Sequence, residues 1–291
     1  MPELPEVETI RRQLSTSIVG LTITGVRASW EKSLTGQGIS LTAAIHQEVV
    51  EVSRRGKVLL VHLSGDVSIL VHLRMTGQLL LDPGRQGEGP LTRAVLSLSE
   101  GQLVFNDQRK FGRLVVMATS RIGDDALLAR MGPEPLSEAF TVEGLRQAIG
   151  RHRTASIKAV LLDQSTVAGL GNIYVDEVLF VAGIHPATPC AALTKSRITK
   201  IAEAIRIVLT LAIARGGSTM RDYRDATGAH GTYLDVAHVF GRTGQPCRAC
   251  GSQIVKERVA GRGTHVCRSC QPRRPNRRAK TPKATLPESR G

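Results

Sequence analysis

The residues that follow the initiator methionine could form a covalent catalytic centre. If Met1 is removed, Pro2 becomes an N-terminal secondary amine. An α-amino group has a pKa of ~7.7–8.0, so part of it is neutral near pH 7 and able to attack an aldehyde-level carbon. The product would be a charged iminium that withdraws electrons from neighbouring carbons, and Glu3 could transfer protons beside it. Taken without the rest of the sequence, Pro2 and Glu3 have a simpler interpretation, in which they begin a helix and favour its dipole.

Four of the five cysteines form two close pairs near the C-terminus. Two residues separate Cys247 from Cys250 and Cys267 from Cys270, and sixteen lie between the pairs. This spacing suits tetrahedral zinc. Two disulfides are the alternative, but the chain starts without an export signal, which favours a reducing compartment. We therefore predict one structural zinc ion on these four thiolates and interpret Cys190, which no motif surrounds, as a structural or surface thiol.

The net charge of +14 is concentrated at the C-terminal end. Residues 241–291 hold 13 basic and 2 acidic residues, or +11, which leaves +3 for the first 240. A concentrated positive segment indicates a polyanionic partner, nucleic acid before anionic membrane, although a solubilising tail has the same composition. Aromatic residues are only 3%, which argues against a stacking platform for single strands. No apolar run approaches the ~20 residues of a membrane helix.

The elements that must position these residues change character along the chain. Apolar residues at three- and four-residue steps predict a helix over Pro5–Ile18. Short alternating runs separated by turns then predict an antiparallel sandwich or barrel. These runs are Glu48–Ser53, Val58–Leu63, Ser68–His72, Leu79–Leu81, Ala94–Leu98, Leu103–Asn106 and Arg113–Val116, with a loop over Asp82–Pro90.

The second half of the chain is predicted to be helical. The segment Gly132–Pro135 is a stiff break between the halves. Helical patterns follow at Val142–Arg151, Ser156–Leu162, Ile173–Val181 and Thr194–Arg215. We predict an α+β chain with a β-sandwich domain over 1–131, a helical domain over 132–240, a zinc finger over 241–270 and a basic, disordered tail over 271–291.

Several motifs stand in a characteristic order along the chain. They are Pro2–Glu8, Arg54–Lys57, His72–Gly77, Arg109–Gly112, Gly132–Leu136, Gly169–Tyr174 and the four-cysteine finger. Together they make the chain resemble the bacterial formamidopyrimidine-DNA glycosylases, or MutM family, from Pro2 to Cys270. The related endonuclease VIII branch shares Pro2-Glu3 and the finger, but Leu4 and Val7-Glu8 fit the MutM branch better.

The resemblance implies a bifunctional enzyme of base excision repair. Such an enzyme removes 8-oxoguanine and formamidopyrimidines from duplex DNA and cuts the strand by β,δ-elimination. Pro2 would form a Schiff base at the deoxyribose C1′, Glu3 would supply proton transfers, and Lys57 would point from a hairpin end at the lesion and a phosphate. These three residues and Arg262, which matches the family's phosphate-binding arginine, are the predicted catalytic set.

The resemblance also implies that the β-sandwich domain is the catalytic one and that the helical domain binds DNA through a helix-two-turn-helix. It further implies which residues hold the DNA. Met75, Arg109 and Phe111 match the residues that fill the gap left by the flipped base, a task suited to an apolar wedge. On pattern alone, Met75 and Phe111 are better interpreted as core residues, and it is the motif Arg109–Gly112 that favours the gap-filling role.

The remaining resemblance concerns phosphate and lesion contacts. Asn172 follows glycines that allow close backbone approach, so it is expected to cap a helix and contact the backbone beside the lesion. His72 and Lys158 are further phosphate candidates. The segment Gly216–Tyr223 resembles a loop that closes over the lesion.

The departures from the family pattern are Val58, Gln108 and Thr264–Val266, where aromatic or proline residues are frequent. They put local packing and lesion preference in question. Two alternatives stay open: an endonuclease VIII-like enzyme for oxidised pyrimidines, and a zinc DNA-binding protein without catalysis. The expected partner is damaged duplex DNA, and a monomeric, cytoplasmic, nucleoid-associated protein without membrane contact is expected.

Overall fold

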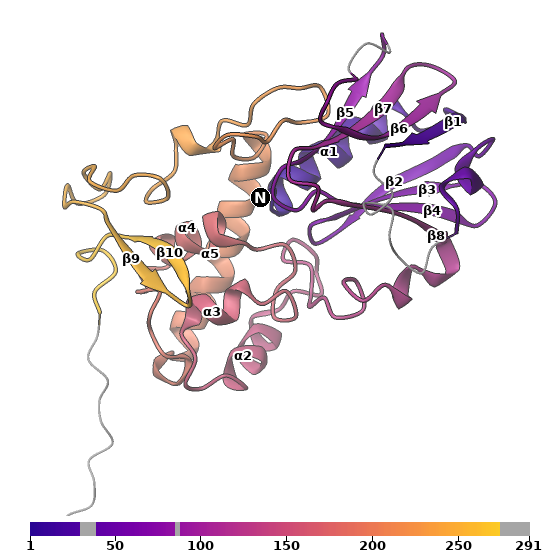
Figure 1. The fold of residues 1–291 in the computed structure, drawn as a ribbon. Coiled ribbons are helices and arrows are strands. Elements are labelled where there is room, and N and C mark those ends of the chain that lie inside the picture. The colour runs from indigo at the N-terminus through magenta and orange to yellow at the C-terminus, as the bar shows by residue number, and fades with distance from the viewer. Residues whose placement is uncertain (30–38, 85–87, 274–291) are drawn as a thin grey trace, which may run out of the picture.

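The computed structural model describes residues 1–29, 39–84 and 88–273 of the chain. Figure 1 shows a sheet-rich half in indigo to magenta and a helical half in pink to yellow, with the N-terminus between them. Most of the predicted tail, residues 274–291, and part of the predicted loop over 82–90 lie outside the described residues.

Two antiparallel four-stranded sheets form the first half, with strand orders β1-β6-β7-β5 and β2-β3-β4-β8. Their inner faces pack on one apolar core that both sheets share with α1. This confirms the predicted sandwich. The strands are β1 (Ile23–Ala28), β2 (Val49–Arg55), β3 (Val58–Leu63), β4 (Val67–His72), β5 (Gly77–Asp82), β6 (Thr92–Leu98), β7 (Gln102–Asp107) and β8 (Arg113–Ala118), and short 3-10 helices cover Leu41–Ala44 and Thr119–Asp124.

The predicted N-terminal helix is α1 (Leu4–Ser17), and it connects the two halves. Its apolar residues Val7, Ile10 and Leu14 pack in the sandwich core, whereas Leu4 packs in the helical core. Pro2 and Glu3 precede Leu4, so the first turn of α1 places the candidate nucleophile at the junction.

The second half is built on helices, as predicted. Its apolar core lies between the helices and includes residues from each of them. The helices are α2 (Val142–Gly150), α3 (Ile157–Leu162), α4 (Asn172–Val181) and α5 (Lys195–Ala214), with 3-10 turns at Cys190–Ala192 and Tyr233–Asp235. None of the described helices is long and apolar enough to span a bilayer.

The finger ends in a two-stranded hairpin of β9 (Val255–Val259) and β10 (Arg262–Val266), drawn in yellow in Figure 1. Its two-residue turn has positive φ at Ala260 (50°) and Gly261 (72°). Both values are those of a type I′ turn, whose twist matches the twist of the paired strands. Arg262 therefore stands at the first position after the tip.

The segment after α5 returns to the sandwich. Tyr223 and Ala226 are buried in the sandwich core, and the Leu81 N–H donates to the Ala226 carbonyl at 2.7 Å. Gln13 of α1 donates to the Asp225 carboxylate at 2.8 Å. The predicted lesion loop and the residues that follow it are thus attached to both halves of the molecule.

Candidate active site

The candidate nucleophile Pro2 is buried beside a cavity that both halves of the molecule form. The cavity has a volume of about 660 Å³. Met75 and Arg109 line it from the sandwich, and Ser218 and Met220 line it from the loop after α5. Met1 precedes Pro2, is 47% exposed and also lines the cavity.

Glu3 lies at the N-terminus of α4, where free backbone N–H groups bind its carboxylate. Gly171 N–H donates to Oε2 at 2.7 Å, and Ile173 N–H donates to Oε1 at 3.0 Å. Burial raises the pKa of Glu3 from 4.5 to about 7, although the nearby Lys57 charge and the backbone hydrogen bonds favour ionisation. A carboxyl group that titrates near neutrality can both donate and accept protons at pH 7.

Lys57 binds the peptide group between Leu170 and Gly171, the same group whose N–H binds Glu3. Its ammonium donates to the Leu170 carbonyl at 2.8 Å, and the N–H of that peptide, on Gly171, donates to Glu3. Burial lowers the pKa of Lys57 from 10.5, with the Glu3 and Glu6 charges opposing the shift. The peptide between Leu170 and Gly171 therefore fixes the two side chains next to each other.

The absence of side chains at two glycines makes this approach possible. A Cβ on Gly171 would stand 2.3 Å from the Glu3 carboxyl carbon. Gly169 has φ +86°, and a Cβ there would stand 2.6 Å from Leu4. The predicted close backbone approach is present, but the anion at this helix N-terminus is the carboxylate of Glu3.

Glu6 was not predicted to have a role, yet it joins the N-terminus to the lesion loop. Its carboxylate accepts hydrogen bonds from the Glu3 N–H (2.7 Å), the Ser218 N–H (2.6 Å) and the Tyr174 hydroxyl (2.5 Å). The signal in the sequence was the three-residue spacing of Glu3 and Glu6, which is that of a capping box.

An ion network fixes the turn that carries Lys57. The Arg54 guanidinium pairs with Glu8 of α1 at 3.1 Å and with Glu134 of the predicted linker at 2.9 Å. Glu134 also accepts the Gly56 N–H at 2.5 Å. Burial alone would raise the pKa of Glu8, but hydrogen bonds from arginines including Arg54 lower it to about 2.

The three predicted gap-filling residues lie on two neighbouring turns. Met75 is 44% exposed and Phe111 is 54% exposed, so the alternative that they belong to the core is wrong. The Arg109 guanidinium lies over the Phe111 ring at 4.8 Å. The buried Asp107 carboxylate holds this turn by accepting the backbone N–H groups of Arg109 (3.1 Å) and Gly112 (2.7 Å).

His72 is neutral in this site. Burial, followed by the charges of Arg74, Lys57 and Arg113, lowers its pKa to about 3. Its Nδ1 accepts the Arg74 N–H at 3.0 Å, which leaves the proton on Nε2. A neutral imidazole with Nε2–H can donate one hydrogen bond to a phosphate oxygen.

In the helical half, two predicted contacts differ from expectation. Gly171, not Asn172, is the N-cap of α4; Asn172 is the first helical residue, and its side-chain amide donates to the Gly263 carbonyl at 3.1 Å. Lys158 is 0% exposed and bound internally, so a direct phosphate contact does not fit its position. Arg262 is exposed at the hairpin tip, as a phosphate contact requires.

The four finger cysteines lie together in a geometry that fits zinc. Their sulfur atoms are all within 4.8 Å of one another, and two of the pairs, Cys250–Cys267 and Cys247–Cys270, are 3.5 and 3.9 Å apart. Thiolates at about 2.3 Å from a tetrahedral zinc ion lie about 3.8 Å apart. These distances exclude the disulfide alternative, and four thiolates leave no open position on the metal, which makes the site structural. Cys190 is buried and free.

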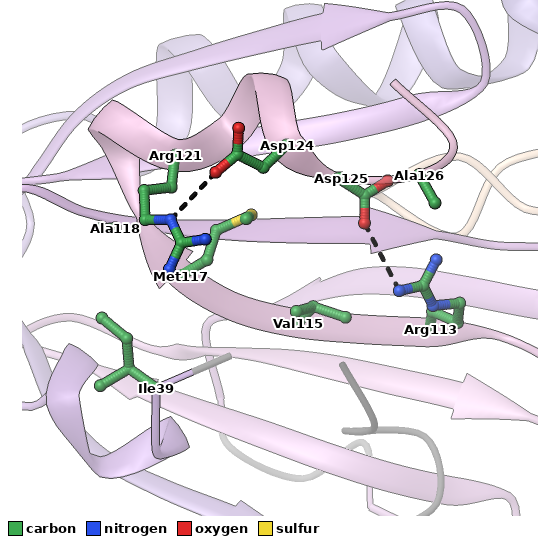
Figure 2. Close-up of a pocket in the computed structure, with 9 residues that line it drawn as sticks. All are labelled: Ile39, Arg113, Val115, Met117, Ala118, Arg121, Asp124, Asp125 and Ala126. Atoms are coloured by element: carbon green, nitrogen blue, oxygen red, sulfur yellow. Dashed lines mark hydrogen bonds and ion pairs between the residues drawn. The ribbon is translucent and has the colours of Figure 1, made fainter. Parts of the chain in front are cut away.

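A second hollow lies on the outer face of the sandwich (Figure 2), and Pro2 is not among the residues that line it. It has a volume of about 440 Å³ and an apolar wall that includes Val115 and Met117. Its charged residues pair with one another, Arg121 with Asp124 at 3.0 Å and Arg113 with Asp125 at 3.5 Å. None of the predicted site residues lines it, so the chemistry is assigned to the cavity beside Pro2.

Comparison with known families covers most of the chain. Residues 1–114 match the model described as "Formamidopyrimidine-DNA glycosylase N-terminal domain", and residues 131–224 match "Formamidopyrimidine-DNA glycosylase H2TH domain". Residues 244–273 match "Zinc finger found in FPG and IleRS".

Whole-length relatives carry the same name. The chain is 45% identical to a formamidopyrimidine-DNA glycosylase of Chloroflexus aurantiacus over 93% of its length and 98% of the relative. It is 42% identical to one of Streptococcus pyogenes over 94% of its length and all of the relative.

The solved structures to which the chain is similar carry the same family name as its sequence relatives. The MutM (FPG) protein of Thermus thermophilus superposes with a TM-score of 0.86 at 42% identity, covering 94% of this chain and all of that one. A Lactococcus lactis Fpg in complex with an abasic site containing DNA gives 0.85 at 38% identity, covering 93% and 100%.

Proposed function

The chain belongs to the formamidopyrimidine-DNA glycosylase family and is a DNA glycosylase of base excision repair; from that premise we propose that Pro2 is its nucleophile, acting on oxidised purines. After removal of Met1, the neutral Pro2 nitrogen forms a bond to C1′ as the bond from C1′ to the base breaks. The base leaves with the electron pair of that bond and takes up a proton, and the Pro2 nitrogen loses its own proton. Opening of the sugar gives an iminium, with Glu3 supplying the proton to O4′. Loss of a C2′ proton then expels the 3′ phosphate, and a further elimination expels the 5′ phosphate.

The observation that carries this proposal is the position of Pro2 beside the cavity, with the buried carboxyl group of the adjacent Glu3 held at the N-terminus of α4. Glu3 adjoins Pro2 in sequence, and burial raises its pKa to about 7. An ionised surface carboxylate would be a poor acid at pH 7, whereas this one keeps a large protonated fraction. Lys57, fixed against the same peptide, adds positive charge where phosphate is expected.

Duplex DNA would lie across the junction, held from both halves. Met75, Arg109 and Phe111 would enter the gap left by the flipped base. His72, Asn172 and Arg262 would contact phosphates. One zinc ion on the four thiolates would keep the finger folded and would take no part in the chemistry. We propose a monomer that is associated with the bacterial chromosome through this surface.

Borohydride trapping tests the proposal directly. Purified protein with an N-terminus verified as Pro2 is mixed with a duplex carrying 8-oxoguanine opposite C, and beside it a duplex carrying 5-hydroxyuracil. We expect a covalent adduct on the 8-oxoguanine duplex, because reduction fixes the iminium. Two controls should give no adduct. Pro2→Gly replaces the secondary amine with a primary amine of different geometry, and a version with an uncleavable residue before Pro2 has no free amine at this position.

Each other outcome has a defined meaning. Adduct formation by the N-terminally blocked protein would refute the amine mechanism. Stronger trapping on 5-hydroxyuracil would refute the purine preference and place the protein with the endonuclease VIII branch. No adduct on either duplex would refute the covalent mechanism proposed for Pro2.

A further inference from the structure

A buried ammonium group lies between α3 and the finger hairpin. Lys158 Nζ is within 2.5 Å of the Asp176 carboxylate and donates to the Thr264 hydroxyl at 2.8 Å and the Gly263 carbonyl at 3.3 Å. Both charged side chains are 0% exposed. Three internal acceptors use all three protons of the ammonium, so it has none left for a DNA phosphate.

The hydroxyl of Thr264 continues this chain of hydrogen bonds to Arg262. It accepts from Lys158 and donates its own proton to the Arg262 carbonyl at 3.1 Å. The buried ammonium is thereby linked, through one hydroxyl, to the backbone of the residue at the hairpin tip.

Other contacts hold the neighbouring hairpin residues to the same helix. Asp176 Oδ2 accepts the His265 N–H at 2.8 Å, and Asn172 donates to the Gly263 carbonyl at 3.1 Å. Residues 262–265 are therefore each bound, directly or through Thr264, to a polar side chain of α3 or α4. Between Arg262 and strand β9 lies only the two-residue turn of Ala260 and Gly261.

The energetics of the buried Lys158–Asp176 pair favour a role in positioning its neighbours over a role in stabilising the fold. Taking two charges out of water costs several kcal/mol per ion, and a buried pair stabilises a fold no better than apolar residues of similar volume. What a buried pair with directed hydrogen bonds does supply is a defined arrangement of the groups around it.

We propose that Lys158, through Thr264, is a positioning residue that sets the direction in which Arg262 leaves the hairpin. The inference rests on the proposed phosphate contact of Arg262. It replaces the expectation that Lys158 touches phosphate itself, and it gives a role to Thr264, one of the departures from the family pattern.

The test uses Thr264→Val, which removes the hydroxyl at nearly constant volume and keeps every charge. Thr264→Ser restores the hydroxyl and is the matched control. Affinity for an undamaged and an 8-oxoguanine duplex is measured against salt concentration, together with zinc content. Arg262→Ala should weaken binding to both duplexes by about tenfold and lower the slope of log K against log salt by about 0.9.

Thr264→Val should show the same kind of loss, equal on both duplexes, with zinc retained and a slope lowered by up to about 0.9 although no charge is gone. Combining it with Arg262→Ala should add nothing, because both act on one contact. Thr264→Ser should behave as the unmodified protein. Lys158→Met should match Thr264→Val, with Lys200→Met, on the exposed surface of α5, as the control for lost charge.

Contrary results separate the inference from the proposed function. Additive losses in the Thr264→Val/Arg262→Ala protein would show that the hydroxyl acts elsewhere. A further drop in slope when Lys158→Met is added to Arg262→Ala would establish a direct phosphate contact. If Lys158→Met does not fold, Thr264→Val alone tests the inference, because it keeps the Lys158–Asp176 ion pair. An unchanged slope in Arg262→Ala would overturn both the arginine's phosphate contact and this inference, while trapping at Pro2 still decides catalysis.

Discussion

Replacing Glu3 with glutamine removes a carboxyl group whose titration should make the protein less stable as pH rises. Burial raises the pKa of this group in the folded protein from 4.5 to about 7. The folded state thus holds the proton more tightly than the unfolded state does. Stability from this group is fully present below pH 4.5 and is lost as pH rises through 7.

The size of the effect follows from the two pKa values. With 4.5 in the unfolded chain and about 7 in the folded one, ionisation of Glu3 costs roughly 0.8 kcal/mol at pH 5 and roughly 3.4 kcal/mol at pH 8.5. Glu3→Gln has no carboxyl group at this position, so the cost of ionisation is absent from its free energy of unfolding. Its stability relative to the unmodified protein should therefore improve by about 2.5 kcal/mol between the two pH values.

The glutamine also changes hydrogen bonding, and comparison across pH removes that contribution. Its amide oxygen can accept only part of the N–H groups that Gly171 and Ile173 direct at the carboxylate, which costs about 1–3 kcal/mol at every pH. Glu3→Gln is thus expected to be less stable than the unmodified protein at pH 5 and to equal or exceed it at pH 8.5.

Urea unfolding of the two proteins at pH 5, 7 and 8.5 measures this difference. Glu51→Gln, an exposed glutamate on β2, is the charge-removal control. The difference in free energy of unfolding between Glu3→Gln and the unmodified protein is compared across the three pH values. If it stays constant within roughly 0.5 kcal/mol, the error of the method, the raised pKa of Glu3 is refuted. The proton-donor role proposed for Glu3 at neutral pH would then lose its basis.

Three further predictions concern the finger, the wedge and the tail. Cys247→Ser should release zinc and weaken DNA binding at least about tenfold; retention of zinc with unchanged affinity would contradict a structural metal. Phe111→Ala should slow excision from a duplex about tenfold while stability changes by less than about 0.5 kcal/mol, since the ring is 54% exposed; a fall in the urea midpoint instead would indicate a core role. Residues 274–291 carry six basic residues and one acidic residue, so their removal should lower the salt slope by up to about 4.5 without affecting trapping at Pro2, and an unchanged slope would favour a solubilising tail.

Features that depend on near neighbours could be predicted from the sequence. The helix at the N-terminus and the four later helices are found within one or two residues of the predicted ends, because the spacing of apolar residues is local. The strand Ile23–Ala28 was missed. Gly25 interrupts its alternation, and its pairing with β6 is irregular between Ile23 and Gly25, so tertiary pairing and not local pattern forms it.

The site itself shows where local patterns fail. Glu3 lies 168 residues from Gly171 in sequence, and no periodicity predicts that its carboxylate would occupy the N-terminus of α4. Asn172 has a common capping side chain, but the glycine before it takes the cap position since only a residue without Cβ fits against Glu3. Lys158 carried no sign of burial, because its counter-charge Asp176 comes from the next helix.

Helix α4 explains why these distant residues meet. It is apolar along most of its length, yet Tyr174, Asp176 and Glu177 are fully buried within it, which such side chains accept only when paired. Each one binds a different part of the chain: Tyr174 binds Glu6 beside the N-terminus, Asp176 the finger hairpin, and Glu177 the backbone N–H groups of residues 238–240. The first turn of the same helix holds Glu3. One short helix therefore fixes the N-terminus, the finger hairpin and residues 238–240 relative to one another, and the consecutive acidic pair in an apolar helix is the feature of the sequence that marks this arrangement.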